Sequence, residues 1–301
     1  PELESEGNKP LSFTFDEQLD VLIYFHLQGF ESGRHLLQAL EEDKMAKELV
    51  APEKGLKKST FFEAINSRGL EQLLHVYNNL CDQAKEVLPY HHPSLGNIVG
   101  IDGSLISATL SMNWADYRQN VNKAKVHPGF DVNRGIPSRF FLTDGKADER
   151  PFVSKMIEPG QTGVLDRYYQ KHEDFDNWQS DQINFVCRIK ERTRIEVVYE
   201  YDIPKGSIVT SDALVLLGSQ GVNQTKQSVR LVRYKVDGNE YLVVTNRFDL
   251  KAEDVALIYK LRWEIEKFFA WWKRQLKVYH LIARTQYGMM VQIISGLITY
   301  L

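Results

Sequence analysis

Cysteine is scarce in this sequence of 301 residues, which contains only Cys81 and Cys187. The two lie far apart and have no metal-type spacing, so we predict neither a disulfide framework nor a cysteine zinc motif. Two buried thiols in a reducing compartment are expected instead, which favours a cytoplasmic protein. Long apolar runs are missing as well, so we predict no segment that spans a bilayer and no membrane partner.

A strong charge of one sign is also missing, because 37 Lys and Arg face 40 Asp and Glu, a net charge of -3. With 43% apolar residues, this composition excludes a disordered chain. The total argues against nucleic acid as a partner, but the charge is unevenly distributed. Residues 1–97 hold 9 basic and 16 acidic side chains, whereas residues 251–301 hold 8 and 4. This regional asymmetry carries more information than the total.

The spacing of apolar residues predicts a small all-helical domain over residues 1–92. The polar residues 1–10 are expected to fray, and helical periodicity extends from Phe15 to about Pro89. Ser59 is predicted to be an N-cap. The segment 57–62, with two lysines and two hydroxyl groups at a helix start, fits either a DNA-recognition helix or a solvated helix start.

Beyond a proline-rich hinge, the pattern changes to that of a mixed α/β layer, over residues 93–190. Strands are predicted at 97–102, 123–131, 138–143, 163–166 and 183–190, and helices at 148–157 and 171–182. Residues 191–250 are predicted to be a β-rich insertion, with strands at 195–201, 229–236 and 241–245 and a hairpin turn at 237–239. Residues 251–301 complete the α/β layer, beginning with one long helix over 252–278. The chain begins without Met and ends inside an apolar periodic run, so we expect it to be part of a longer protein.

The predicted closing helix carries an unusual polar face. At about 100° per residue, Tyr259, Arg262, Glu266 and Lys273 fall within an arc of roughly 60°. The opposite side forms a stripe predicted to face the core, which consists of Leu257, Leu261, Ile265, Phe268, Phe269, Trp272 and Leu276. The polar arc fits a solvated, salt-bridged surface, but it also suits a carboxylate that holds a cation beside groups that bind phosphates.

Two further acids come directly after short apolar strand segments. Asp102 follows residues 98–101 and Asp166 follows 164–165, so adjacent strands would bring both carboxylates to one edge of the sheet. Glu266 could meet them from a helix packed on that sheet, whereas Glu264 lies outside the polar arc. Three converging carboxylates require a cation, and their hard oxygen ligands suit Mg²⁺ or Mn²⁺. Two such ions can activate a water or hydroxyl and stabilise the leaving oxygen of a phosphodiester.

The spacing Tyr259-x2-Arg262-x3-Glu266-x6-Lys273 resembles the Y-R-E-K signature of DDE transposases of the insertion-sequence-four family, relatives of the transposon-five transposase. Residues 101–104 resemble the first-aspartate motif of that family, and residues 164–169 resemble its second; the likeness covers about residues 98–290. The resemblance implies a ribonuclease H-like fold in which Asp102, Asp166 and Glu266 are the metal-binding catalytic acids. It also implies that Tyr259, Arg262 and Lys273 contact transposon-end DNA. Arg284, just past the helix, is predicted to contact a phosphate.

Two departures from the family pattern concern aromatic residues. Tyr168 stands where family members have glycine, so the resemblance does not predict the backbone conformation at this position. Relatives that form a DNA hairpin stack a flipped base on a tryptophan of the insertion, and residues 191–250 contain none. The tyrosines of this segment either stack a base or pack in the sheet; they are Tyr199, Tyr201, Tyr234 and Tyr241. His127 either touches the scissile phosphate or is a packed strand histidine.

These observations predict an α/β enzyme with a ribonuclease H-like core, a β-rich insertion and a preceding helical domain. We expect a Mg²⁺-dependent transposase that cuts element ends in double-stranded DNA and joins the freed 3′-hydroxyl to target DNA. A homodimer assembled on DNA is expected, because two ends must be joined together. Two alternatives stay open: a metal-dependent nuclease without strand transfer, and a DNA-binding protein that no longer cuts.

Overall fold

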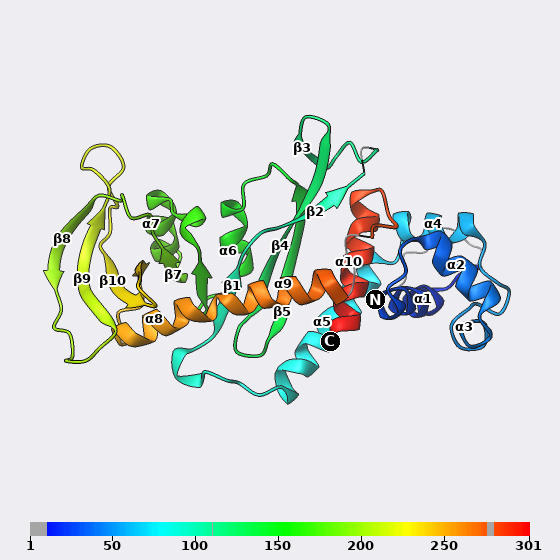
Figure 1. Cartoon of the computed structure of the whole chain (residues 1–301), viewed down its shortest axis with the longest axis horizontal. Helices are drawn as coiled ribbons and strands as arrows, with labels where there is room; N and C mark the ends of the chain where they lie inside the picture. The colour runs from blue at the N-terminus through cyan, green and yellow to red at the C-terminus, as the bar shows by residue number, and fades with distance from the viewer. Residues whose placement is uncertain (1–10, 110, 276–279) are drawn as a thin grey trace.

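The computed structural model describes residues 11–109, 111–275 and 280–301. A long mixed sheet lies between two groups of helices, with the N-terminal helices at one end of the molecule and the insertion strands at the other (Figure 1). The predicted fraying of residues 1–10 and the predicted core position of Leu276 lie outside the described residues.

The N-terminal region is helical, as predicted. Its helices are α1 (Phe15–Gln28), α2 (Gly33–Glu42), α3 (Lys44–Leu49), α4 (Lys58–Ser67) and α5 (Leu70–Val87). The predicted N-cap at Ser59 is wrong, because α4 begins one residue earlier and Lys57 occupies the cap position without a side-chain cap bond. Lys57 and Lys58 are both exposed. Their exposure fits both a DNA-recognition helix and a solvated helix start.

The C-terminal helix α10 (Gln286–Tyr300) packs against α1, α4 and α5. Figure 1 shows it between the central sheet and the N-terminal helices. The buried His26 of α1 donates from Nε2 to the carbonyl of Gln292, 3.0 Å away, and lies 3.2 Å from the hydroxyl of Ser295. The N-terminal helices therefore share their core with residues from the other end of the chain.

The central part of the sheet has the strand arrangement expected for a ribonuclease H-like core. Its strands are β1 (Ile98–Ile101), β2 (Ser104–Ala108), β3 (Asp116–Arg118), β4 (Val121–Asp131), β5 (Ile136–Asp144), β6 (Thr162–Leu165) and β7 (Asn184–Arg188). Strand β4 pairs antiparallel with β1 and β5, whereas β1, β6 and β7 are parallel neighbours. The parallel strands are short and buried on both faces, which explains their continuous apolar sequences.

The insertion extends this same sheet. Its strands are β8 (Ile195–Glu200), β9 (Val209–Leu217), β10 (Val229–Val236) and β11 (Asn239–Thr245), and β11 pairs antiparallel with β7. The sequence did not predict β9. The predicted hairpin turn is confirmed, because Val236 pairs with Asn239 and the intervening Asp237 and Gly238 have φ of 50° and 78°. Two positive φ values in a two-residue loop are those of a type I′ turn.

Helices cover both faces of the sheet. One face carries α8 (Ala252–Leu261) and α9 (Trp263–Gln275), and the other carries α7 (His172–Ser180) with the short α6 (Val153–Met156). The prediction of a single helix over 252–278 is wrong within the described residues, because a turn at Arg262 separates α8 from α9. Leu257 was predicted to face the core but is 38% exposed. Ile265, Phe268, Phe269 and Trp272 are buried, as expected, while Leu261 is partly buried against the same core.

No helix in the described part of the chain is both long and apolar enough to cross a membrane.

Candidate active site

Asp102 and Asp166 emerge side by side from two parallel strands. Strands β1 and β6 pair with Gly100 opposite Val164, and each aspartate lies two residues further along its strand direction. Side chains two residues apart point to the same face of a sheet. Gly100 lies beneath Ile265 of α9, and Val164 belongs to the core on the α8–α9 face. Both aspartates are therefore directed to the face that α9 covers.

Glu266 reaches this sheet edge from the first turn of α9, and Arg262 connects it to the first aspartate. The Nη2 atom of Arg262 lies 2.7 Å from Oε1 of Glu266, and its Nη1 lies 4.0 Å from Oδ2 of Asp102. Arg262 is only 8% exposed, and its Nε has no hydrogen-bond partner among the described residues. One guanidinium is therefore shared, with incomplete hydrogen bonding, between two of the predicted catalytic carboxylates.

The turn at Arg262 explains how a helical residue reaches both carboxylates. The amide of Arg262 donates to the carbonyl of Tyr259, 3.2 Å away, and the carbonyl of Arg262 accepts from Ile265 at the same distance. These i to i+3 bonds tighten the chain for one turn, as in a 3₁₀-helix. No glycine or proline marks this change, so the sequence pattern continues through it as if the helix were uninterrupted.

The pKa of Asp102 is raised to about 6. Burial is the largest cause, because it penalises the charged carboxylate. The charge of Arg262 and the amide of Gly103, which donates to Oδ1 over 2.9 Å, lower the pKa of Asp102, whereas Asp166 and Glu149 raise it. Asp102 therefore lies close enough to two other acids, Asp166 and Glu149, for their negative charges to raise its pKa.

Tyr259 and Lys273 lie on the same side as the acids. Tyr259 is 4% exposed, and the guanidinium of Arg262 lies over its ring, 5.8 Å from the centroid. Burial lowers the pKa of Lys273, while the negative charge of Asp102 raises it and the positive charge of Lys123 lowers it. The polar arc predicted from the sequence is thus directed at the sheet edge and is not a solvated surface.

Arg284 lies apart from this group. Its side chain is exposed, its amide donates to Asn66 of α4 over 3.4 Å, and its carbonyl accepts from the indole of Trp114 over 3.0 Å. None of its contacts in the described chain reaches the three acids. Arg284 is therefore available to a phosphate, but at the boundary between the sheet and the N-terminal helices.

Arg188 is a candidate that the sequence analysis missed. It ends β7 next to Asp166, because Leu165 pairs with Cys187 in the parallel ladder. Its guanidinium lies 4.8 Å from the ring centroid of Tyr241, and its charge lowers the pKa of Tyr259. It forms no ion pair within the described ranges. The sequence feature that could have indicated Arg188 is a basic residue at the end of an apolar strand. Asp102 and Asp166 occupy similar positions at the ends of β1 and β6.

The insertion tyrosines fall into two groups. Tyr234 is buried and stacks on Tyr241, with ring centroids 5.2 Å apart and planes 9° apart, so these two pack in the sheet. Tyr199 and Tyr201 are exposed and contact each other edge to face at 5.0 Å. Exposed rings are the ones that a base can reach, which leaves base stacking a prediction for this outer pair.

His127 is a packed strand histidine. It is fully buried, stacks on Phe152 with centroids 4.5 Å apart, and its Nε2 lies 2.8 Å from the hydroxyl of Thr143. Burial is the main reason that its pKa falls to about 4, and the nearby charge of Lys125 lowers it further. A neutral, enclosed imidazole does not reach a DNA phosphate, so the alternative role of His127 is not supported by its position.

Tyr168 fits its position without the glycine that the resemblance predicts. It lies in the short 3₁₀-helix η3 (Arg167–Tyr169), where its amide donates to Oδ1 of Asp166 over 2.8 Å. Its backbone is not in the left-handed region, so a side chain causes no strain there. The ring is 48% exposed, and the guanidinium of Arg150 lies 5.8 Å from its centroid.

A mixed sheet with two strand-end aspartates and a helix-borne glutamate defines the class of DDE phosphoryl-transfer domains. Residues 93–301 match the family model described as "Transposase DDE domain", and the chain belongs to this family. Membership of the insertion-sequence-four group in particular stays a prediction.

Curated relatives are transposases. The chain is 28% identical over 191 residues to a probable transposase for insertion sequence element IS5377 from Geobacillus stearothermophilus, covering 62% of this chain and 50% of that protein. It is 26% identical over 206 residues to the putative transposase y4zB from Sinorhizobium fredii, with 66% and 58% covered. It is 25% identical over 215 residues to a putative transposase for insertion sequence element IS4SA from Synechocystis, with 68% and 58% covered.

These matches span only half to three fifths of the length of each relative. Among solved structures, a piggyBac transposase synaptic complex with hairpin DNA shows a TM-score of 0.48 and 10% identity, covering 99% of this chain and 68% of that chain.

Proposed function

We propose that this protein is a metal-dependent DNA transposase that cuts element ends and joins them to target DNA. The proposal is supported by two observations: Asp102 and Asp166 follow two paired parallel strands, and the guanidinium of Arg262 lies between Asp102 and Glu266. Family membership supports this assignment, because the domain model covers the sheet, the insertion and α9.

The donor groups at this edge fit a divalent cation. In the described ranges, no three His, Cys, Asp or Glu side chains already stand at metal-ligand positions, and Arg262 holds two of the acids instead. Carboxylate oxygens are hard ligands of the kind that Mg²⁺ or Mn²⁺ prefers. Asp102, Asp166 and Glu266 would hold these divalent cations, and we propose that two ions bind. When bound, they supply an activated water and stabilise the leaving oxygen.

The remaining groups of the site act on DNA. Arg262, Lys273 and Arg188 present positive charge beside the acids, where the backbone of the cleaved strand must lie. Tyr259 adjoins these cations, since Arg262 lies over its ring and the charge of Arg188 lowers its pKa. We infer that these residues hold the phosphates that flank the cleaved bond. The 3′-hydroxyl then remains at the same acids for strand transfer.

A basic cavity on the opposite face of the sheet offers a continuation for DNA. It has a volume of about 840 Å³ and is lined by Lys190, Arg192, Arg194 and Lys226. These four side chains form no ion pair within the part of the chain that the structure describes. Gln170, four residues after Asp166, donates to the hydroxyl of Thr193 in the cavity wall over 2.9 Å, so the cavity is joined to the Asp166 loop.

The test is Mg²⁺-dependent cleavage of duplexes that contain the ends of the element. We expect Glu266→Gln to lose cleavage by at least about a thousandfold, because removing metal-bound charge costs several kcal/mol of transition-state stabilisation. Glu264→Gln is the matched control, since this half-buried neighbour pairs with Lys267 at 2.7 Å. Undiminished cutting by Glu266→Gln would overturn the assignment. A strand-transfer assay separates transposition from simple hydrolysis.

A further inference from the structure

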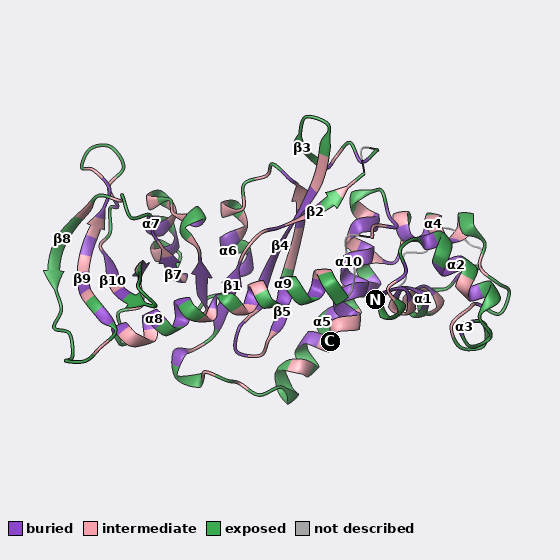
Figure 2. Ribbon diagram, viewed as in Figure 1, coloured by how far each residue is buried: buried purple, intermediate pink, exposed green. Residues whose placement is uncertain are grey.

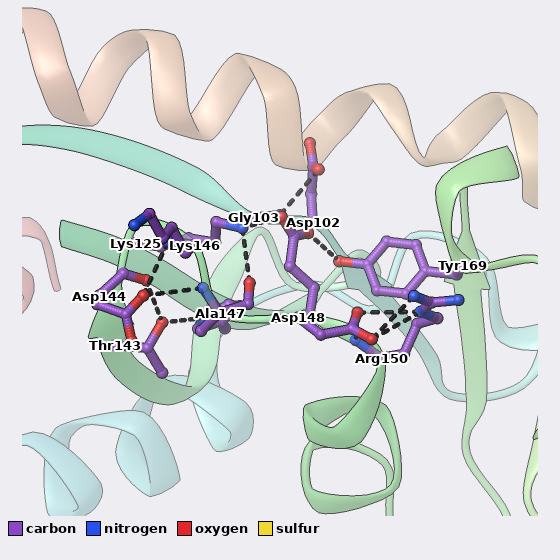
Figure 3. Close-up of polar contacts among 12 residues, drawn as sticks. Asp102, Gly103, Lys125, Thr143, Asp144, Lys146, Ala147, Asp148, Arg150 and Tyr169 are labelled. Atoms are coloured by element: carbon purple, nitrogen blue, oxygen red, sulfur yellow. Dashed lines mark hydrogen bonds and ion pairs between the residues drawn. The ribbon is translucent and has the colours of Figure 1, made fainter. Parts of the chain in front are cut away.

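A buried network lies behind the two aspartates, centred on Glu149. Its side chain is 14% exposed, and its Oε1 lies 3.2 Å from Nζ of Lys125, whose side chain is 10% exposed. The hydroxyl of the buried Tyr169 donates to Oε2 of Glu149 over 2.8 Å. Figure 3 shows Lys125 and Tyr169 on either side of the strand end that carries Asp102 and Gly103.

Two of the residues next to Glu149, Gly103 and Tyr169, follow the two aspartates in the chain. Gly103 directly follows Asp102, and its Cα lies so close to the Glu149 carboxyl that an added Cβ would clash with it. Tyr169 ends the 3₁₀-turn that starts at Asp166, and its amide donates to the Asp166 carbonyl over 3.2 Å. One carboxylate therefore contacts the chain one residue after Asp102 and three residues after Asp166.

Glu149 is placed to orient these groups but not to bind a cation itself. Its two oxygens are already engaged, one by an ammonium and the other by a phenol hydroxyl. Lys125 is held in turn, because its Nζ donates to the carbonyl of Ala147 over 2.8 Å. A buried carboxylate with both oxygens satisfied and its charge matched is a rigid connection.

We propose that Glu149 is a positioning residue that fixes the spacing between Asp102 and Asp166. It does so through Tyr169 on one side and Gly103 on the other, with Lys125 matching its charge. The inference rests on the proposed function and deepens it, since it names the group that prepares the two aspartates for a shared cation. Outer residues of this kind typically change metal affinity by ten- to a hundredfold.

The experiment is a titration of the purified full chain with Mn²⁺, in which free ion is measured by electron paramagnetic resonance. We expect Glu149→Ala to weaken Mn²⁺ binding by at least about tenfold. Tyr169→Phe, which removes a single hydroxyl, is expected to weaken it in the same direction. The double variant should be no weaker than Glu149→Ala alone, because Tyr169 acts through Glu149. Asp148→Ala is the control, since this exposed neighbour pairs with Arg150 at 2.9 Å.

Two results would overturn the positioning role. The first is an affinity in Glu149→Ala and in Tyr169→Phe equal to that of the Asp148→Ala control. The second is a loss in Glu149→Gln as large as that in Asp102→Asn, because that would make Glu149 a ligand. Failure of the proposed function looks different: Asp102→Asn and Asp166→Asn would then both bind Mn²⁺ as the unsubstituted chain does.

Discussion

Two buried arginines of this protein face carboxylates in contrasting ways. Arg230 of the insertion donates to both oxygens of Asp212 over 2.9 and 2.7 Å and to the carbonyl of Leu250 over 2.6 Å. Arg262 makes one close contact, to Glu266, and lies 4.0 Å from Asp102. Both arginines are 8% exposed, so burial alone does not distinguish them.

The difference lies in how completely each charge is satisfied. The Arg230 pair is bidentate and closed, which is the geometry of a structural ion pair. The Arg262 group leaves Nε of the guanidinium without a hydrogen-bond partner among the described residues. Unsatisfied buried polar groups cost free energy, and natural proteins retain them mainly at functional sites. The comparison therefore separates a pair that stabilises the fold from a group that awaits a ligand.

The largest expected effect is on stability at the closed pair. Replacing Asp212 by Ala leaves Arg230 buried without its partner, which should lower the free energy of unfolding by about 3–5 kcal/mol. Arg262→Ala should cost clearly less, because it also relieves an incomplete network. Urea unfolding of the two variants measures both values. Equal losses would remove the distinction between the two arginines.

A divalent cation should stabilise the open group alone. At a Mg²⁺ concentration of about 100 times its dissociation constant, the gain in unfolding free energy should be about 2.7 kcal/mol. Asp102→Asn should abolish this gain, and Asp212→Asn should keep it, each measured relative to its own metal-free protein. Thermal melts with and without Mg²⁺ provide the measurement. A gain that survives Asp102→Asn would place the cation elsewhere.

Acidification should destabilise the fold through His127, another buried group with incomplete hydrogen bonding. Its Nδ1 has no hydrogen-bond partner among the described residues. Its folded-state pKa of about 4 lies below the ordinary value of 6.5. Its contribution to stability is therefore fully present above pH 6.5 and is lost as pH falls from 6.5 to 4, by about 3 kcal/mol. His127→Gln should flatten the pH dependence of unfolding in this window. An unchanged slope would assign the acid sensitivity to other groups.

The smallest expected effect concerns cations with and without carboxylate partners. Arg188→Ala should reduce the salt dependence of DNA binding by about one counterion, since the free guanidinium is expected to contact one phosphate. Arg139→Ala should leave that slope unchanged, because this exposed arginine already pairs with Glu158 at 2.5 Å. Fluorescence anisotropy across a range of salt concentrations compares the two. The same slope in both variants would contradict a DNA contact at Arg188.

Much of the candidate site could be predicted because it depends on local patterns. Asp102 and Asp166 each follow a short apolar run, and parallel strands bring such positions to one edge. The polar arc of Glu266 was visible from helical spacing. The site residues themselves remain proposals until they are tested, but the structure places these three acids on the same side of the sheet.

What could not be predicted depends on tertiary contacts. Glu149 comes from an irregular segment next to a short 3₁₀-turn, so no periodicity indicates that it reaches Gly103 and Tyr169. The turn at Arg262 contains no proline or glycine, so the sequence pattern does not predict it. The pairing of β11 with β7 is a long-range choice that strand patterns leave open.

The packing of α10 has a consequence for how the chain is made. His26 and its neighbours on α1 emerge from the ribosome long before Gln292 and Ser295, which cover them. The N-terminal helices must therefore wait, with part of their core open, while more than 200 residues are translated (Figure 2 shows α10 buried among them). At roughly 5–20 residues per second, this wait lasts on the order of ten seconds or more, long enough for a chaperone to bind.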